Sequence, residues 1–298
     1  MKSLRLIPFT IILFIVSCSP AKKESAETTE ETMPKKVSYK LEKQWETDTL
    51  LRTPESVLYD TERDIIYVAN VNMNPWEKDG NGFISKISST GEITDLEWVT
   101  GLNGPKGMAL VGTSLFVADL DELVEIDVTT GKVKSKTVVE GASGMNDISS
   151  DGKGTLYISD SNGDKIFKHT NGKAEVYKDG LPGRPNGQLV VGSHLFAAFS
   201  AAQKFYDIDL SSGEMTLVAD SIGHGDGITP TTEAGVYLVS DWQGEIFIIS
   251  DGIGKQSLLH TKNEKKNTAD IWFMMDQELV LVPTFFDNRV VAYKLIKG

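Results

Sequence analysis

The chain has 298 residues, and 42 acidic residues against 30 basic ones give it a formal net charge of −12. Such a charge disfavours phosphate backbones and anionic head groups, so we expect no nucleic-acid partner. The only cysteine, Cys18, lies near the N-terminus, so no internal disulfide can form and no cysteine nucleophile is available. A well-packed core must therefore stabilise the protein even outside the cell.

The first 17 residues predict a secretory signal, because Lys2 and Arg5 flank an apolar stretch at 6–16 that is too short to span a bilayer. Residues 15–18 also resemble the bacterial lipobox, in which the signal is cut before a cysteine that becomes lipidated. We interpret residues 1–17 as a lipoprotein signal peptide and Cys18 as the lipidation site. The expected location is the cell envelope, in the outer membrane or on a surface facing the periplasm. The alternative is an ordinary signal with an incidental cysteine.

Residues 18–35 predict a flexible tether, because they are rich in Lys, Glu, Thr, Ser and Ala and have no apolar period. Residues 36–298 are predicted to form one domain. Six related segments recur there at intervals of about 40 residues, which is typical of β-propeller blades. These segments are 54–58, 105–109, 145–149, 185–189, 225–229 and 268–272.

Each repeat continues in the same way. An apolar run rich in β-branched and aromatic residues predicts a buried strand. These runs are 65–69, 115–119, 156–160, 195–199, 236–240 and 279–283. A third strand, a glycine turn such as 90–92 or 130–132, and a more polar outer strand follow. The fold class is therefore predicted to be all-β, a six-bladed β-propeller of four-stranded blades.

The last repeat ends before a fourth strand, whereas residues 37–41 have strand character and no partner of their own. We expect this N-terminal strand to complete blade six and close the ring. Closure would remove the exposed sheet edges that favour aggregation.

The inner strands of a propeller line its channel, so equivalent positions at their starts are expected to converge. These positions hold Glu55, Lys106, Asn146, Asn186, Asp226 and Ala269. Carboxylates and carboxamides without thiol or imidazole favour Ca²⁺ or Mg²⁺. A simpler interpretation is that Asn-Gly and Asp-Gly form turns entering the inner strands.

The order Glu, Asn, Asn, Asp in blades one, three, four and five resembles the SMP-30/gluconolactonase propellers, which are related to squid-type phosphotriesterases and strictosidine-synthase-like proteins. The resemblance covers the whole predicted propeller. It implies one divalent metal ion, Ca²⁺ foremost, held by Glu55, Asn146, Asn186 and Asp226. It also implies that the ion acts as a Lewis acid while Asp226 is base or nucleophile.

Lys106 departs from this pattern. Its ammonium could replace the ion beside Glu55 and Asp226, or it could be a catalytic group that stabilises an oxyanion. A third interpretation is that its long stem carries the charge to the channel mouth and water.

Several residues near these positions are weaker candidates. Asp147 is interpreted as structural, with support of the metal ligands as the alternative, and His224 is a candidate proton carrier although a polar loop role is the simpler interpretation. Asn70, Asp119, Asp160 and Asp241 follow the second strand of their blades, where we expect them to bind backbone, with Asp241 also near the metal.

These observations predict an exported, lipid-anchored, metal-dependent hydrolase that opens a lactone or similar ester. The alternative is a non-catalytic propeller that binds a ligand or displays an interaction face on the membrane. In both cases the expected partners are a small molecule in the channel and the membrane through Cys18, and the protein is expected to be a monomer.

Overall fold

The computed structural model describes residues 37–298, and nearly all its regular structure is β-strand. The predicted signal peptide at 1–17, Cys18 and the tether at 18–35 lie outside the described residues. Two short 3₁₀ helices, η1 (Lys262–Glu264) and η2 (Phe285–Asp287), accompany the strands. Within residues 37–298 no helix is long and apolar enough to cross a membrane.

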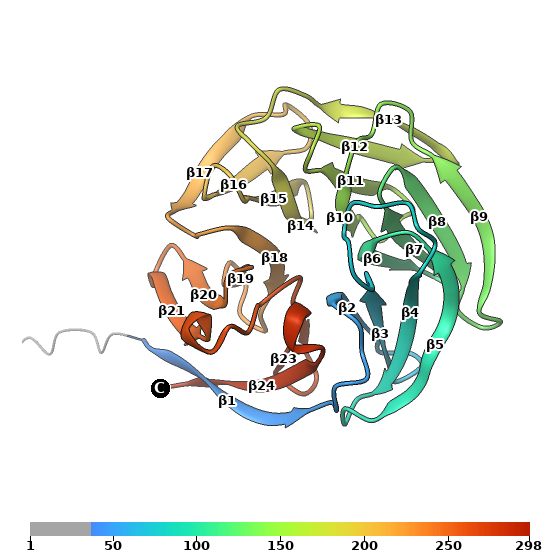
Figure 1. Cartoon of the computed structure of the whole chain (residues 1–298). Helices are drawn as coiled ribbons and strands as arrows, with labels where there is room; N and C mark the ends of the chain where they lie inside the picture. The colour runs from blue at the N-terminus through green and yellow to red at the C-terminus, as the bar shows by residue number, and fades with distance from the viewer. Residues whose placement is uncertain (1–36) are drawn as a thin grey trace, which may run out of the picture. The chain divides into compact units, whose positions relative to one another are not determined.

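The strands form six antiparallel sheets of four strands each, arranged in a ring (Figure 1). In blades one to five the strands pair in chain order, with the first strand beside the central axis and the fourth at the periphery. This arrangement confirms the predicted all-β, six-bladed propeller of four-stranded blades.

Blades one to three have the following strands: β2 (Pro54–Asp60), β3 (Ile65–Asn70), β4 (Gly82–Ser88) and β5 (Ile93–Leu102); β6 (Pro105–Val111), β7 (Ser114–Asp119), β8 (Glu122–Asp127) and β9 (Lys132–Val138); β10 (Met145–Ser150), β11 (Leu156–Asp160), β12 (Lys165–Thr170) and β13 (Lys173–Lys178). Blades four to six have these strands: β14 (Pro185–Val191), β15 (His194–Phe199), β16 (Lys204–Asp209) and β17 (Met215–Asp220); β18 (Gly225–Pro230), β19 (Tyr237–Asp241), β20 (Glu245–Ser250) and β21 (Gly254–His260); β22 (Trp272–Met274), β23 (Leu279–Pro283), β24 (Val290–Lys297) and β1 (Tyr39–Glu46).

Blade six is completed by the N-terminal strand, as predicted. β1 pairs antiparallel with β24, from Tyr39 opposite Lys297 to Glu46 opposite Val291, with one irregularity between Lys43 and Trp45. The blue β1 and the red β24 lie side by side in Figure 1. The first and last described strands therefore hold the ring closed.

The hydrophobic core is a ring of six clusters, and each cluster joins two neighbouring blades. Going round from blades one and two to blades six and one, the clusters contain Tyr67 with Val117, Ala118 with Ile158, Tyr157 with Leu195, Phe196 with Val239, Leu238 with Val280, and Leu281 with Ile66. Successive residues of one strand face opposite sides of its sheet. The second strand of each blade is therefore apolar at consecutive positions, because it packs against both neighbours.

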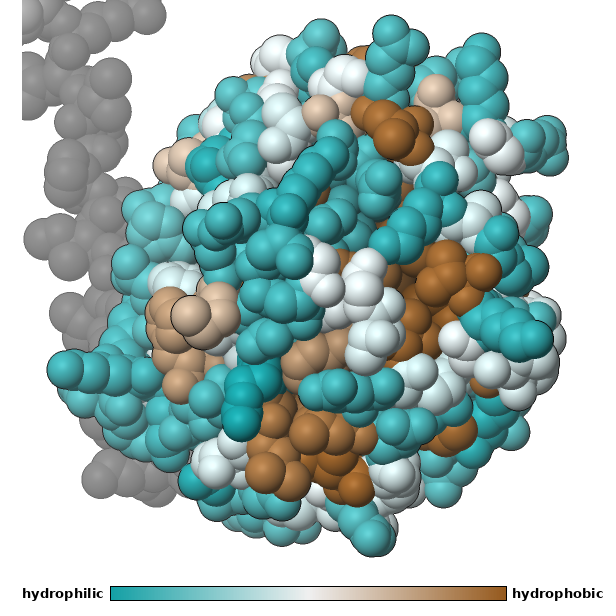
Figure 2. All heavy atoms as spheres, turned by 45° about the vertical axis from the view of Figure 1, so that its right-hand side comes forward, coloured by the Kyte–Doolittle hydropathy of each residue, from teal (hydrophilic) through white to brown (hydrophobic). Residues whose placement is uncertain are grey.

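The molecular surface has the opposite character. Figure 2 shows a mostly hydrophilic face on which hydrophobic residues gather in separate patches. The interior clusters therefore hold the blades together, and the turns and outer strands are in contact with water.

A candidate metal centre in the central channel

The predicted channel residues lie at irregular points of the inner strands. In blades two to five, two residues have no partner on the adjacent strand, between Pro105 and Met108, Met145 and Ile148, Pro185 and Gln188, and Gly225 and Ile228. In blade one the register shifts between Pro54 and Ser56, which flank Glu55. Such bulges redirect side chains and are frequent beside functional sites.

The Asn-Gly and Asp-Gly dipeptides are therefore not turns. Asn186-Gly187 lies inside β14 and Asp226-Gly227 inside β18, so the interpretation that they form turns entering the strands is wrong. The glycines serve close packing instead. A Cβ atom on Gly187 would overlap the backbone oxygen of Asp226, and one on Gly227 would overlap the backbone nitrogen of Ile271. The missing side chains let neighbouring inner strands approach around the channel.

The starts of the inner strands surround a cavity of about 370 Å³, here called the first cavity. Glu55, Lys106, Asn146, Asn186 and Asp226 all line it. These five residues are separated by up to 171 positions in the sequence, and the repeat brings them together as predicted. The sixth equivalent position, Ala269, is fully buried and lies outside the set of lining residues.

Two carboxyl groups in the first cavity are buried close to each other. Burial raises the pKa of Glu55 well above its usual range, and the charge of Asp226 adds to the rise. Burial likewise raises the pKa of Asp226, with Asp270 adding to the rise and the Asn186 side chain opposing it. Lys106 lowers both pKa values. Two such groups ionise together only beside sufficient positive charge.

Two oxygen atoms of the predicted ligands have no internal partner. Glu55 Oε2 and Asn186 Oδ1 are buried and accept no hydrogen bond from the described part of the chain. Asn146 Nδ2 donates to Ser161 Oγ at 3.2 Å, which uses its amino group and leaves the carbonyl oxygen as the amide's acceptor. Unpartnered oxygens of this kind fit a hard cation such as Ca²⁺.

The side-chain chemistry of this donor set is half carboxylate and half amide. Residues 37–298 contain no group of three or more His, Cys, Asp and Glu side chains arranged to hold a metal ion. Glu55 and Asp226 contribute two carboxylates, and the remaining donors are the amides of Asn146 and Asn186. The residues present therefore fit a divalent cation only as a mixed carboxylate and carboxamide site.

One of the three interpretations of Lys106, that its stem carries the charge to the channel mouth and water, is wrong. Its side chain is 1% exposed, so the ammonium does not reach water at the channel mouth. Nζ donates to the backbone oxygens of Pro75 at 2.6 Å and Gly104 at 2.9 Å, and lies 4.5 Å from the ring centroid of Trp76. It forms no ion pair within 4.0 Å with Glu55 or Asp226. Burial lowers its pKa to about 8, against the raising effect of Glu55.

The polar residues at the ends of the second strands bind backbone, as predicted. Asn70 Oδ1 accepts from Arg52 N, Asp119 accepts from Asn103 N and Gly104 N, and Asp160 accepts from Ser143 N. In each blade the bond fixes the loop that leads into the inner strand. By fixing these loops, the bonds help to hold the channel residues in position.

Asp241 has the same role in blade five. Its Oδ1 accepts from His224 N at 2.9 Å and Gln243 N at 3.1 Å, and Lys262 Nζ lies 2.6 Å from Oδ2. His224 lines the first cavity, where the sequence analysis expected it. Asp241 thus holds the loop that carries His224 towards Asp226, and its charge raises the pKa of Asp226.

Asp147 lies in a different cavity. It lines a second cavity of about 500 Å³, formed by the middle and C-terminal parts of the inner strands, and not the first cavity. Its Oδ1 accepts from Ile148 N at 2.7 Å and its Oδ2 from Gln188 N at 2.6 Å. Asp147 is thus bonded to backbone on two inner strands and has no hydrogen bond to the side chains of the predicted ligands.

The first cavity also has an apolar wall. Trp76, Trp242, Phe285 and Phe286 line it, and the last three contact one another edge to face with centroids 4.9–5.9 Å apart. Met73, Arg184, Ser200 and Gln243 also line it, and none of them was predicted from the sequence. Their only signal was proximity to the repeats, since Arg184 directly precedes Pro185-Asn186. They lie in connections between strands, where sequence periodicity is silent.

Comparison with known proteins supports the fold. No protein-family model matches the chain, and no curated protein matches it in sequence. Virginiamycin B lyase from Staphylococcus aureus superposes with a TM-score of 0.62 at 15% identity, covering 87% of this chain and 100% of the lyase. A streptogramin B lyase structure gives 0.61 at 15% identity, covering 87% and 98%.

A chain from a nidogen/laminin complex gives a TM-score of 0.61 at 18% identity, covering 74% of this chain and 84% of that one. At these identities the likeness establishes the fold alone. The two lyases are six-bladed propellers, in agreement with the ring described above. The resemblance to SMP-30/gluconolactonase proteins stays a prediction, and the chain is similar in structure to six-bladed β-propeller proteins.

Proposed function

We propose that the protein is a divalent-metal-dependent hydrolase of the SMP-30/gluconolactonase type, opening a lactone or similar ester in the first cavity. One observation carries the proposal. Glu55 Oε2 and Asn186 Oδ1, from two of the four predicted ligands, are buried without a partner in the cavity that Asn146 and Asp226 also line. Leaving such acceptors unsatisfied is costly, and a Ca²⁺ ion would satisfy both.

The four ligands and the ion would divide the chemistry. The ion would polarise the carbonyl of the bound ester as a Lewis acid. Asp226 accepts a proton from the water whose oxygen attacks the carbonyl carbon. The ring C–O bond then breaks, and the proton passes to the departing alkoxide oxygen, giving a hydroxy acid. Burial raises the pKa of Asp226, which suits a group that both accepts and returns a proton.

Lys106 suits a supporting role in this reaction. An ammonium has three N–H donors, and Pro75 O and Gly104 O use two of them. The third is available to negative charge that develops on a substrate oxygen. The two backbone bonds fix the ammonium, so this charge is preorganised.

The apolar wall of the first cavity indicates which kind of substrate would fit. The aromatic group of Trp76, Trp242, Phe285 and Phe286 lines the same cavity as the polar set. A substrate with both an ester carbonyl and an apolar substituent would use both parts. We therefore propose lactones with hydrophobic side chains as the first class to test. We further propose that the protein is exported and lipid-anchored through Cys18.

The test is calcium titration by calorimetry on the purified protein, with lactone hydrolysis measured on the same samples. We expect saturable binding in the wild type, and Asp226→Ala should weaken it by about a hundredfold or more, since a charged ligand is lost. Glu62→Gln removes one charge at the opposite end of the channel and should change neither binding nor turnover.

The rival function is a non-catalytic ligand-binding propeller, and the buried charge of Lys106 favours it. That charge lowers the pKa of both Glu55 and Asp226 and so offsets part of the need for an ion. Absence of calcium binding in the wild type would reject the metal-dependent enzyme and leave this alternative. Binding without hydrolysis of any lactone or phosphotriester would leave a structural ion in a binding protein.

A further inference from the structure

We propose that the second cavity is a separate binding site for a small organic cation, namely a protonated amine attached to an apolar group. The cavity has a volume of about 500 Å³, within the range of small-molecule sites. Asp147, Asp270 and Gln188 line it together with apolar residues and further polar ones, among them Asp60 and Glu62, and it shares no residue with the first cavity. The proposal does not depend on the hydrolase function.

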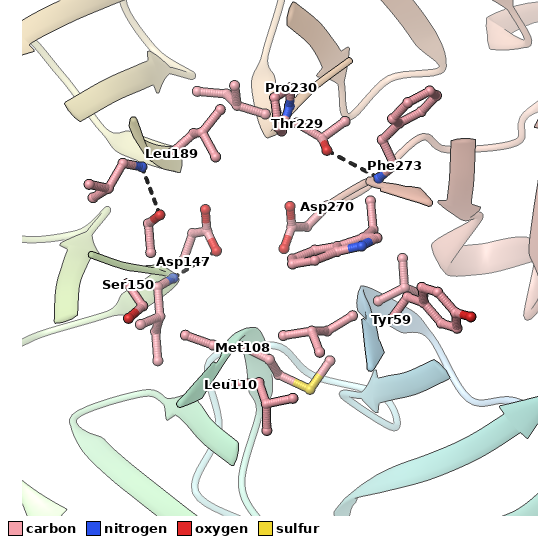
Figure 3. A pocket seen from close by; sticks show the side chains of 18 of the residues that line it. Tyr59, Met108, Leu110, Asp147, Ser150, Leu189, Thr229, Pro230, Asp270 and Phe273 are labelled. Carbon is pink, nitrogen blue, oxygen red and sulfur yellow. Dashed lines mark hydrogen bonds between the residues drawn. The ribbon is translucent and has the colours of Figure 1, made fainter. Parts of the chain in front are cut away.

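Two acidic side chains face each other in this cavity, and neither has a basic partner within residues 37–298. Figure 3 shows the Asp147 and Asp270 side chains extending towards each other across the cavity, from β10 and from the segment before β22. Asp270 Oδ2 accepts from Ser56 Oγ at 2.6 Å, which leaves its other oxygen available. In the described part of the chain, no Lys, Arg or His lines the cavity. A cation is therefore the complementary ligand.

A second observation points to a donor-bearing ligand. Gln188 is 3% exposed and lines the cavity, and its Oε1 is buried without a hydrogen-bond partner. Its Nε2 is already used, donating to Asp147 O at 2.9 Å and Tyr157 O at 3.1 Å. The amide is thus fixed with its acceptor free. An ammonium N–H can fill this acceptor and one carboxylate oxygen together.

The acceptors are held rigidly by the fold. Asp147 accepts backbone bonds from Ile148 on its own strand and from Gln188 on the next inner strand. Gln188 in turn binds back to Asp147 O. This reciprocal pair links blades three and four at the channel wall. Binding would therefore require little reorganisation of the protein side.

The remaining wall is apolar and decides the kind of cation. Met108, Leu110, Ile228, Trp272 and Phe273 line the cavity. A bare divalent ion prefers six or more oxygen donors and gains nothing from such a wall. An amine with an apolar body matches the acid pair and the wall at once.

The experiment is a titration with 2-phenylethylamine, protonated at neutral pH, and with the neutral analogue 2-phenylethanol, followed by calorimetry. We expect saturable binding of the amine and binding of the alcohol that is weaker by about tenfold or more, because one charged hydrogen bond is lost. This comparison uses only wild-type protein, so it does not depend on any variant folding.

Two pairs of variants locate the site. Asp270→Asn keeps the acceptor for Ser56 and should weaken amine binding by about tenfold or more. Glu62→Gln removes the same charge from an exposed side chain at the cavity rim and should change it less than twofold. Asp226→Asn removes a charge in the first cavity that acts on the acid pair only from outside the second cavity, and it should weaken amine binding much less than Asp270→Asn does. Thermal melting of each variant checks that it is folded.

Other outcomes would overturn the proposal. Equal binding of the alcohol would reduce the cavity to an apolar pocket. Loss of amine binding in Asp226→Asn but not in Asp270→Asn would move the site to the first cavity. Displacement of the amine by Ca²⁺ in wild type, lost in Asp270→Asn, would identify a metal site instead. Because Asp226 and Asp270 lie in different cavities, failure here and failure of the hydrolase proposal are distinguishable.

Discussion

Lys106 carries a charge into the interior without a carboxylate in direct contact. Its ammonium is held by two backbone oxygens and the face of Trp76, and its side chain is among the largest that are fully buried. A buried ammonium loses hydration, which is why burial lowers its pKa to about 8. Buried charged groups with shifted pKa values cluster at functional sites, where a fixed charge takes part in binding or catalysis.

This cost predicts a pH dependence of stability. Below about pH 8 the lysine is charged in both folded and unfolded protein, and the full burial cost applies. Between about pH 8 and the unfolded value of 10.5 the folded form is neutral while the unfolded form is still protonated, so stability rises with pH. From pH 7.5 to 9.5 the wild type should gain about 2 kcal/mol relative to Lys106→Met.

Urea unfolding of the wild type and of Lys106→Met, in the presence of a metal chelator, measures this difference. The matched control is Lys78→Met, because the pKa of Lys78 is raised by its bond to Asp121 and the residue stays protonated across the range. The control should show no change between the two pH values. If the difference in unfolding free energy between the wild type and Lys106→Met were the same at both pH values, the ammonium would be solvated in the folded protein.

At the scale of the single strand, the inner strands combine a bulge with a glycine. The bulge turns the first unpaired residue to the first cavity, and the next position is glycine in blades two, four and five. In blade three the next position is Asp147, whose carboxylate lines the second cavity. Two adjacent residues of one bulge therefore serve different ends of the channel.

Gly187→Ala should disrupt both the packing of the inner strands and the proposed metal site. The added Cβ would overlap the backbone oxygen of Asp226, so β14 and β18 would have to separate. We expect a loss of at least about 2 kcal/mol in the free energy of unfolding, with a marked loss of calcium affinity. Urea unfolding and calorimetry measure the two effects.

The control is Gly252→Ala. Nothing lies within 4 Å of a Cβ added there, and its backbone is not in the left-handed region. It should leave stability unchanged or slightly higher, because alanine restricts the unfolded chain. If Gly187→Ala behaved like this control, the close approach of the inner strands would not be needed for the site.

At the scale of the whole molecule, the ring has six interfaces between neighbouring blades, and its sixth blade is completed by the N-terminal strand. Tyr39 is buried in the cluster between blades five and six, and Leu41 packs against it. Gln256 on β21 also donates to Tyr39 O at 3.0 Å. β1 therefore covers the edge of β24 and completes the last part of the core.

Deleting residues 37–48 should weaken the entire ring. It removes the buried Tyr39 and exposes the hydrogen-bonding edge of β24, so we expect the melting temperature to fall by about 10 °C or more, with concentration-dependent association. Calorimetric melting and light scattering measure these effects. A peptide of residues 37–48 should restore the melt and a scrambled peptide should not; an unchanged melt after deletion would contradict this account of closure.

The sequence by itself determined the number of blades, their four strands, the closing strand and the convergence of Glu55, Lys106, Asn146, Asn186 and Asp226. It could do so because a repeat places equivalent residues at equivalent points of a closed ring, whatever the details of packing. The oxygen-rich chemistry of these side chains followed in the same way, since it is read directly from residue type.

Only the tertiary structure decided where neighbouring residues face. Asn146 and Asp147 are adjacent in sequence, yet the β-bulge in β10 directs their side chains to different cavities. The partners of Lys106 are the backbone oxygens of Pro75, in the connection between β3 and β4, and of Gly104, and their approach depends on loop conformation and not on periodicity. The second cavity arises from the spacing of six inner strands, which is set by contacts between blades. A linear pattern encodes which side chains are available, and the three-dimensional packing determines which of them meet.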